Sequence, residues 1–189
     1  GSASQDGLIA STHAGEDDLI LDAHRAVRAR WPDALLVLAP RHPERCGAVE
    51  QRCVAHGFGV LRRSSAQTPE RADVYLLDTL GELAGLYGAA QVALVGGSLL
   101  PGGGGHNLIE PALAGVPVLF GPYMQNFVAL RDAVLAAGAG REVGRSSALA
   151  DSVITLLADP PLRLRMGAAG RELVRKHGGA SARTLALVE

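Results

Sequence analysis

Short apolar runs alternate along the chain with longer segments in which apolar and polar residues mix. The segment 17–30 is amphipathic, the pattern of a helix with one buried face. The apolar runs lie at 7–12, 34–39, 57–62, 73–77, 91–97 and 116–121, and the helical segments at 17–30, 43–56, 79–87, 107–114 and 127–137. Apolar strands that alternate with helices predict a parallel sheet covered on both faces. The predicted class is α/β with a doubly wound sheet.

The last part of the chain, from about 146, contains two further helical segments and no candidate site. Asp159, Pro160 and Pro161 separate these segments, because a proline ends one helix and starts the next. Gly1 and Ser2 are typical of the scar that remains after an expression tag is removed. The length of 189 residues fits one domain at roughly 100–200 residues per domain. Residues 3–189 are therefore predicted to form a single domain.

Composition narrows the classes of partner. The 18 Lys and Arg residues nearly balance 19 Asp and Glu residues, so no general positive field attracts nucleic acid or anionic lipid. No apolar run approaches the roughly 20 residues that span a bilayer, and no signal pattern opens the chain, so we expect a soluble chain. Cys46 and Cys53 fit neither a redox nor a zinc motif, and we expect two reduced thiols in a cytoplasmic setting.

In a doubly wound sheet, ligands bind outside the carboxyl ends of the strands. One of these strand exits reads GGSLLPGGGGHN, residues 96–107. Its backbone amides and the start of the following helix can converge on an anion such as a phosphate. The loop lacks the Gly-Lys-Ser/Thr of a Walker loop, and it follows the fifth strand, which makes it a poor dinucleotide fingerprint. A plain flexible loop is the alternative interpretation.

An acidic residue follows this loop at a helical spacing. Glu110 comes three residues after Asn107, so we expect both side chains on one helix face. A carboxylate at this place accepts hydrogen bonds from the two adjacent hydroxyls of a ribose, while Asn107 and the loop amides hold a phosphate. The alternative is an exposed acid that interacts favourably with the helix N-terminus.

Two other strand exits carry candidate nucleotide contacts. PRHPER, 40–45, offers Arg41 as a fork of donors for a base or phosphate; a surface ion pair with Glu44 is the alternative. In DTLGEL, 78–83, Asp78 or Thr79 with Glu82 is typical of a capping box. Gly81 is unfavourable in a first helical turn, which suggests that a ligand lies against it.

The first strand exit, THAGEDD at 12–18, combines His13 with Glu16, Asp17 and Asp18. The acids are suited to a helix N-terminus, and His13 fits a site role and a structural role equally. No spacing of His and carboxylate residues matches a metal site, and we expect no metal and no cofactor. A Gly-x-Ser-x-Gly elbow and a Ser-x-x-Lys motif are also missing, which argues against covalent hydrolase chemistry.

Taken together, STHAGED, PRHPER, DTLGELAGLY, GGSLLPGGGGHNLIEPALAGVPVLFGP and NF resemble the C-terminal half of the 3-deoxy-D-manno-octulosonic acid (Kdo) transferases of lipopolysaccharide synthesis. The likeness covers about 8–127. It implies the GT-B fold, in which two Rossmann-like domains face a cleft, and it implies that this chain is the half that binds the donor CMP-Kdo. The family's Gly-Gly-His-Asn-x-x-Glu-Pro nucleotide loop matches Gly104, Gly105, His106, Asn107, Glu110 and Pro111.

Carried over by position, Arg41 contacts the nucleotide, the backbone around Leu80 and Gly81 reads the cytosine edge, and Glu110 binds the ribose. The implied nucleotide site comprises Arg41, His42, Leu80, Gly81, Gly97, Ser98, Gly104, Gly105, His106, Asn107 and Glu110. Candidates for contact with the donor sugar or with the other domain are His13, Glu16 and Asn126. Ala14 replaces an acid of the family's His-Glu-Gly-Glu motif, and Leu80 replaces a frequent methionine.

The resemblance implies an inverting, metal-independent transfer of Kdo from CMP-Kdo to a lipid A precursor, on the cytoplasmic side of the bacterial inner membrane. The acceptor, the catalytic base and any membrane contact belong to the other half, so the chain alone is expected to bind CMP without catalysis. Two alternatives stay open: the donor domain of a UDP-sugar epimerase with the same fold, and a non-catalytic nucleotide-binding domain.

Overall fold

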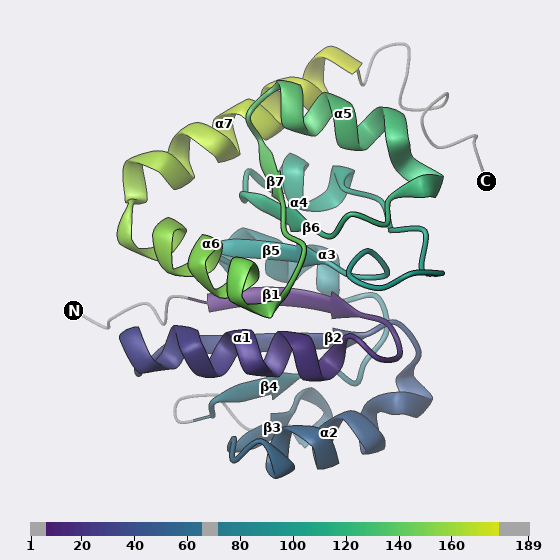
Figure 1. Ribbon diagram of the computed structural model, residues 1–189, viewed down its shortest axis with the longest axis vertical. Coiled ribbons are helices and arrows are strands. Elements are labelled where there is room, and N and C mark those ends of the chain that lie inside the picture. Colours follow the sequence, from purple (N-terminus) through teal and green to yellow (C-terminus); the bar gives the residue numbers. More distant parts are fainter. Residues whose placement is uncertain (1–6, 66–71, 178–189) are drawn as a thin grey trace.

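The computed structural model describes residues 7–65 and 72–177. Gly1 and Ser2, interpreted as a scar, and the end of the predicted domain after 177 lie outside the described residues. Within them, the strands form one sheet in which every pairing is parallel, and this confirms the α/β class (Figure 1). The strands are β1 (Gly7–Thr12), β2 (Leu35–Pro40), β3 (Val60–Arg62), β4 (Val74–Leu76), β5 (Val92–Val95), β6 (Val118–Phe120) and β7 (Gly140–Glu142).

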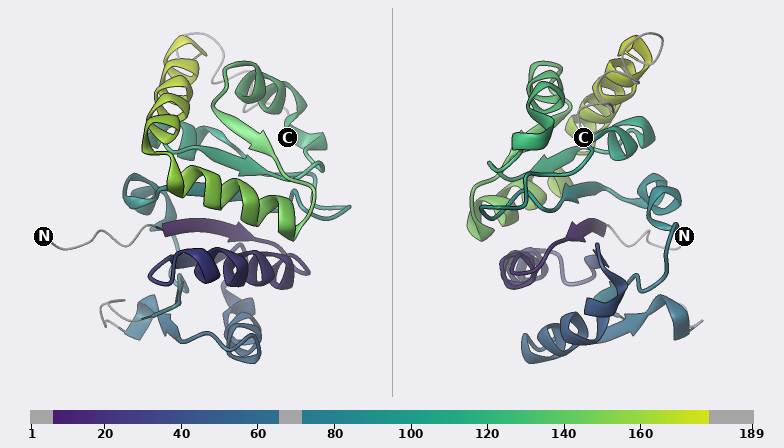
Figure 2. Two further views of the ribbon diagram at one scale, coloured as in Figure 1. Left: turned by 60° about the vertical axis from the view of Figure 1, so that its left-hand side comes forward. Right: turned by 90° about the vertical axis from the view of Figure 1, so that its right-hand side faces the viewer.

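Helices cover both faces of this sheet, as its apolar strands require. α1 and α6 pack together over one face, whereas α3 and α4 lie over the other (Figure 2). The helices are α1 (Asp17–Arg30), α2 (Cys46–Ala55), α3 (Leu83–Leu86), α4 (Ile109–Ala114), α5 (Val128–Ala136), α6 (Ser146–Ala158) and α7 (Pro160–His177). α6 and α7 are the two predicted C-terminal helices, and α7 packs against α4.

The strand β2 shows how the sequence supplies both layers of core. Leu36 and Leu38 are fully buried in the cluster beneath α1 and α6, whereas Val37 between them packs into the cluster beneath α3. Successive side chains of a strand point to opposite faces, so a continuous apolar run fills both layers. Cys46 and Cys53 are buried free thiols, as expected, and burial raises the pKa of Cys53 to about 12.

The strand order is β3-β4-β2-β1-β5-β6-β7. From β1 the chain adds β2 beside it, then the edge strand β3, and then β4 between β2 and β3. It then returns to the other side of β1 to add β5, β6 and β7. The order therefore reverses between β1 and β5, which are hydrogen-bonded neighbours. Such a switch point opens a crevice at the carboxyl ends of the two strands, and the segments that leave it are the His13 segment and the glycine loop.

The structure differs from the sequence prediction in three details. The edge strand β7 was not predicted, because it has only three residues and two of them, Arg141 and Glu142, are charged. The predicted helix 79–87 is a single turn, α3, followed by a 3₁₀ turn at Tyr87–Ala89. The helix predicted to start at 107 begins at Ile109.

Candidate functional site

The structure brings the candidate residues together at the carboxyl edge of the sheet, around the switch point between β1 and β5. Two neighbouring cavities open there. The larger, of about 430 Å³, is lined by residues that include Arg41, Leu80, Gly81, His106, Asn107 and Glu110. The smaller, of about 260 Å³, is lined by His13, Ala14, Glu16, Gly97, Leu100, Pro101, Gly102 and Gly103. The remaining candidates, His42, Ser98, Gly104, Gly105 and Asn126, line neither cavity.

The carboxylate of Glu16 fixes the glycine loop to the exit of β1. It is buried at 1% exposure and accepts hydrogen bonds from the backbone amides of Gly97 and Ser98, at 2.9 and 3.0 Å. It also accepts bonds from the amides of Leu99 at 2.8 Å and His13 at 2.9 Å. Converging backbone amides form an anion-binding concavity, and here an anion of the protein itself occupies it.

The rest of the glycine loop folds back on itself. The amide of Gly105 donates to the carbonyl of Gly97 at 2.8 Å, and the amide of Asn126 donates to the carbonyl of Gly104 at 3.0 Å. A Cβ on Gly103 would lie 2.0 Å from the Gly97 carbonyl oxygen, so a larger residue has no room. At Gly103 the glycine serves this close backbone packing, in contrast to the plain flexible loop that the sequence left open.

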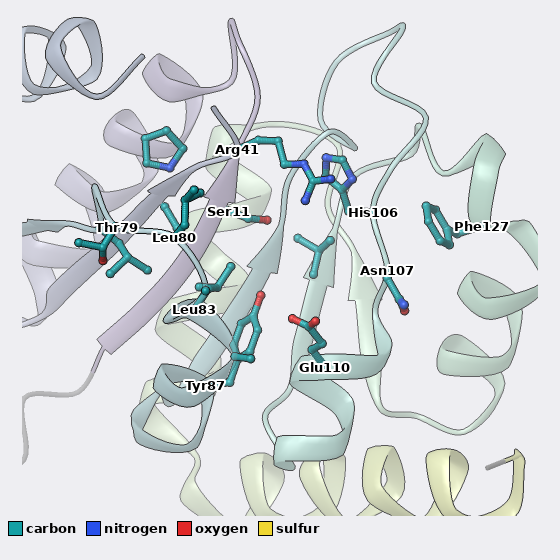
Figure 3. Close-up of a pocket in the computed structure, with 16 residues that line it drawn as sticks. Ser11, Arg41, Thr79, Leu80, Leu83, Tyr87, His106, Asn107, Glu110 and Phe127 are labelled. Atoms are coloured by element: carbon teal, nitrogen blue, oxygen red, sulfur yellow. The ribbon is translucent and has the colours of Figure 1, made fainter. Parts of the chain in front are cut away.

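Glu110 and Asn107 lie at the wall of the larger cavity that α4 provides (Figure 3). Asn107 precedes α4, and its side-chain oxygen accepts the Ile109 amide at 2.9 Å, which satisfies one of the free donors at the helix start. Glu110 is in the first turn of α4, exposed, and near Tyr87 of the facing 3₁₀ turn. Burial and then the Glu110 carboxylate raise the pKa of Tyr87.

The opposite wall of the larger cavity comes from the loop after β4. The capping box predicted there was wrong: Asp78 accepts bonds from the amide and hydroxyl of Ser64, and Glu82 pairs with Arg63. Gly81 has a φ of +80° and no atom within 4 Å of a Cβ built on it. Its backbone conformation, which favours glycine, therefore explains this residue without a ligand. The neighbouring Leu80 is 79% exposed.

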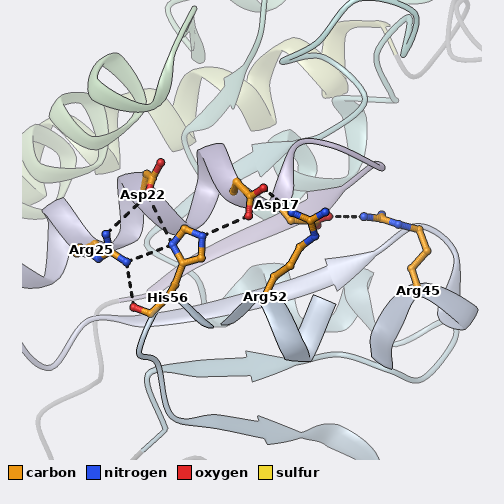
Figure 4. A network of polar contacts seen from close by, with 7 residues as sticks. Asp17, Asp22, Arg25, Arg45, Arg52 and His56 are labelled. Atoms are coloured by element: carbon orange, nitrogen blue, oxygen red, sulfur yellow. Dashed lines mark hydrogen bonds and ion pairs between the residues drawn. The ribbon is translucent and has the colours of Figure 1, made fainter. Parts of the chain in front are cut away.

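Arg41 enters the cavity from the exit of β2, and Figure 3 shows its guanidinium beside the imidazole of His106. The Arg41 amide donates to the Thr12 carbonyl at 2.9 Å, so this loop is attached to the end of β1. Arg45, four residues on, forms an ion pair with the buried carboxylate of Asp17 in α1 (Figure 4). The alternative pair of Arg41 with Glu44 is not among the ion pairs of the described residues; Oε1 of Glu44 lies 3.8 Å from Nδ1 of His42.

Three imidazoles from three strand exits meet between the cavities. The ring centroid of His13 lies 4.7 Å from that of His106 and 6.0 Å from that of His42. Burial lowers the pKa of His13 and of His106. His42 and Arg41 lower both pKa values further, Arg45 also lowers that of His13, and His13 that of His106, whereas Glu16 opposes them. The pairing of His13 with His106 could not be predicted from the sequence, because the two residues are far apart along the chain.

Several cavity residues were missed by the sequence analysis: Ser11, Thr79, Leu83, Tyr87 and Phe127. Ser11 and Thr79 lie near strand exits, and this position could have identified them from the sequence. Tyr87 and Phe127 are brought to the cavity only by the fold. Among residues 7–65 and 72–177, no group of three or more His, Cys, Asp or Glu side chains is placed to hold a metal ion. Within the same ranges, no helix is both long and apolar enough to span a bilayer.

The sequence is similar to known transferases. The 3-deoxy-D-manno-octulosonic acid transferase of Haemophilus influenzae is 40% identical over 184 residues, which are 96% of this chain and 43% of that protein. The Bordetella pertussis enzyme is 43% identical over 187 residues, with the same two coverages of 96% and 43%. This chain therefore spans less than half the length of these curated relatives. No protein-family model matches it.

One solved structure decides the family. The C-terminal CMP-Kdo binding domain of WaaA from Acinetobacter baumannii is 34% identical and has a TM-score of 0.85, covering 90% of this chain and 89% of that one. The chain belongs to the Kdo transferase family. As a Kdo transferase domain it has the fold of the C-terminal half of a GT-B glycosyltransferase, which confirms the resemblance and the Rossmann-like architecture that it implied.

Proposed function

We propose that this Kdo transferase domain binds the donor CMP-Kdo and holds its CMP part in the larger cavity. One observation carries the proposal: the cavity joins Arg41, Gly81 and Glu110 from three separate strand exits at the switch point. A CMP-Kdo binding domain of 34% identity and the same fold supports the choice of ligand. Residues 3–189 then act as one donor-binding domain.

The cavity walls suggest an orientation for the nucleotide. The backbone around Leu80 and Gly81 faces the cytosine, and the exposed Glu110 carboxylate accepts hydrogen bonds from the ribose hydroxyls. Arg41 and His106, which lie together on the side of β2 and the glycine loop, face the phosphate (Figure 3). Asn107 lies beside the same loop. This arrangement places a charge-assisted contact at each end of the nucleotide.

Within the glycine loop, the predicted phosphate contacts divide into two groups. The amides of Gly97 and Ser98 already donate to Glu16, and the amide of Gly105 donates to Gly97. These residues therefore shape the loop, as does Gly104, which lines neither cavity, and we assign direct phosphate contact to the amide of His106.

The Kdo part of the donor is assigned to the smaller cavity. That cavity adjoins the larger one through the His13 and His106 rings, and its walls are the backbone of the glycine loop and the His13 segment. His42 and Asn126 are exposed beside this edge, and we propose that they face the donor sugar or the other domain. Glu16 contributes by holding the loop, because its oxygens are committed to backbone amides.

The reaction proposed for the whole enzyme is an inverting transfer to a lipid A precursor at the cytoplasmic face of the bacterial inner membrane. The acceptor, the catalytic base and any membrane contact are assigned to the part of the relatives that this chain does not span. Arg41 and the imidazoles supply the positive charge that a departing phosphate requires, so the transfer is proposed to need no metal and no cofactor. Nucleic acid is not a proposed partner.

Calorimetric titration of the chain with CMP, UMP and AMP tests the donor assignment. We expect CMP to bind with clear preference, because the Gly81 loop presents backbone donors and acceptors to the cytosine edge. Preference for UMP would favour the epimerase alternative. Equal heats for the three nucleotides, or none at millimolar concentration, would contradict the proposal. The CMP affinity is expected to be the same in magnesium and in EDTA, and a several-fold loss on chelation would refute metal independence.

A transfer assay tests the division of labour. The chain, CMP-Kdo and a lipid A precursor are incubated beside a full-length relative, and no transfer by the chain is expected. Alignment of donor and acceptor can supply roughly 7–11 kcal/mol of a barrier, and a placed base about another 10²–10⁴-fold in rate. Turnover at a thousandth of the control rate would place the base within this chain. If the full-length parent binds CMP-Kdo but transfers nothing, the non-catalytic alternative is supported.

A further inference from the structure

The His13 and His106 pair occupies the boundary between the two cavities, where neither ring has an evident structural task. His106 lines the larger cavity and His13 lines the smaller. Their ring centroids are 4.7 Å apart, and Nε2 of each ring is buried without a hydrogen-bond partner among the described residues. A buried polar atom that lacks a partner calls for an explanation, and a missing ligand or ion is one of the recognised ones.

We propose that the paired imidazoles of His13 and His106 form an anion subsite that takes up a proton from solvent when the acidic donor binds. The inference rests on the proposed function and adds the charge state in which this site works. The anion is a phosphate or a carboxylate, since both groups occur in CMP-Kdo and either cavity brings one to an edge of the pair.

Protonating both of these neighbouring rings is energetically unfavourable, because the two positive charges would repel one another at short range. The groups that face them are mostly cationic: Arg41 and His42 act on both rings, and Arg45 acts on His13. Glu16 is the opposing negative group, but its carboxylate already accepts hydrogen bonds from four backbone amides. The pair is therefore expected to be neutral at pH 7 when the site holds no anion.

An anion next to the pair reverses this balance. Opposite charge within a few Å favours the protonated imidazole, so one of the two rings gains a proton. Both rings also pack over Gly97: a Cβ there would lie 2.9 Å from Nε2 of His106 and 3.5 Å from Cδ2 of His13. The glycine loop thus holds the two rings together beside the anion. Protonation on binding makes the donor affinity higher at lower pH.

The test is calorimetry of the whole chain with CMP at pH 7, in two buffers that differ in ionisation enthalpy. The difference in heat gives the number of protons taken up. The phosphate of CMP also titrates near pH 6, so each variant is compared with the wild type for the same ligand, and the ligand's own contribution cancels. We expect the His13→Asn, His106→Asn double variant to take up fewer protons than the wild type. His177→Asn, at the exposed end of α7, serves as the matched control and should behave as the wild type.

Titrations with different ligands identify the anion that the pair binds. Cytidine, which has no acidic group, should bind without proton uptake. Uptake with CMP assigns the subsite to the phosphate, and uptake with Kdo but not with CMP assigns it to the carboxylate. With one linked proton the wild-type affinity falls by at most about tenfold per pH unit as the pH rises through the pKa of the bound pair, and the double variant should show a flatter profile.

A second measurement covers the case in which the double variant binds too weakly for calorimetry. The Cε1 proton resonances of His13 and His106 in the wild-type chain are followed by NMR over pH 5–9, with and without saturating CMP or Kdo. We expect the pKa of at least one ring to rise on saturation. If CMP and Kdo bind but the ring pKa values stay unchanged and proton uptake is equal in the wild type and the double variant, this inference is wrong. The proposed function would still stand in that case. Absence of any nucleotide binding would overturn the proposed function and this inference with it.

Discussion

The carboxylate of Glu16 accepts a hydrogen bond of 3.0 Å from the backbone amide of Ser98, which lies 82 residues further along the chain. This contact joins the exits of β1 and β5, the two strands between which the sheet order reverses. Because the bonded group is a charged carboxylate in a nest of amides, it holds the loop as a bound phosphate would. The crevice of the switch point is therefore shaped in part by an anion of the protein itself.

Glu16→Gln is expected to destabilise the domain by about 3 kcal/mol, since each charge-assisted hydrogen bond lost contributes roughly 1.5–3 kcal/mol. The amide nitrogen of glutamine cannot accept, so two of the four backbone donors lose their partner. Urea unfolding of the variant measures the change. Asp18→Asn, which alters a half-exposed acid that contacts Arg52 and His56, is the control and should cost less than about 1 kcal/mol. Equal losses in the two variants would show that the buried contact has no special role.

Glu110→Gln is expected to weaken CMP binding without unfolding the domain. The side chain is exposed on α4, so stability should change little, whereas loss of the charged acceptor for the ribose hydroxyls costs roughly 1.5–3 kcal/mol. That corresponds to about 10- to 150-fold in affinity, measured by calorimetry. Glu44→Gln, another exposed acid at this edge, is the matched control. A variant that melts far lower and binds normally once folded would make Glu110 a structural residue.

Arg45→Gln should loosen the loop that presents Arg41. It leaves the buried Asp17 carboxylate without its partner (Figure 4), and such a loss typically costs about 3–5 kcal/mol. The Thr12 carbonyl, to which the Arg41 amide is attached, also loses a weak contact with Arg45 at 3.4 Å. We expect lower stability together with weaker CMP binding at temperatures where the variant is folded.

The same substitution at Arg52 provides the control for Arg45→Gln. Arg52 pairs with Asp18, and both side chains are about half exposed, at 50% and 49%. Exposed ion pairs contribute less than about 1 kcal/mol, so Arg52→Gln should leave stability and CMP binding nearly unchanged. If the Arg45 variant loses stability but binds CMP with wild-type affinity, Arg45 supports the fold without positioning Arg41.

The sequence predicted the doubly wound sheet because the information is local: each apolar run fills both layers, as Leu36, Val37 and Leu38 do in β2. It also placed the candidate residues at the correct edge, because strand exits of a parallel sheet share one side. What it could not predict depends on contacts between distant segments. Glu16 was expected at a helix N-terminus or in contact with the donor sugar or the other domain, but three of its four backbone partners are 81 to 83 residues away.

The failure of the capping box at Asp78 has a similar cause. The spacing with Glu82 matched the motif, but Ser64 and Arg63, from the exit of β3, compete for both acids. Local sequence rules assume that a side chain finds its partner nearby, and here a neighbouring strand supplies a better one. The assignments of ribose, phosphate and base contacts in the larger cavity remain predictions.

Acid should destabilise the domain through His24. This side chain is 1% exposed, its Nε2 lies 3.0 Å from the Asp73 carbonyl, and its ring centroid lies 5.1 Å from that of Phe58. Burial, against the opposing hydrogen bond to the Asp73 carbonyl, lowers its pKa from 6.5 to about 4. Between these two pH values the unfolded chain binds a proton that the folded chain does not, so the free energy of unfolding falls as the pH falls through this window.

The full loss in the free energy of unfolding through His24 is about 3 kcal/mol. One proton is involved, and each unit of difference between the folded and unfolded pKa corresponds to about 1.36 kcal/mol. Urea unfolding midpoints from pH 7 to 4.5 measure it, and His24→Gln, which keeps a side-chain donor for the Asp73 carbonyl, should flatten the profile. His13 and His106, whose pKa values are also lowered, act in the same direction in both proteins, so the difference between the two profiles isolates His24. His177→Gln, at an exposed position, should keep the wild-type slope. Parallel profiles for wild type and His24→Gln would mean that the folded chain binds the proton as readily as the unfolded chain does, and that the buried imidazole is charged.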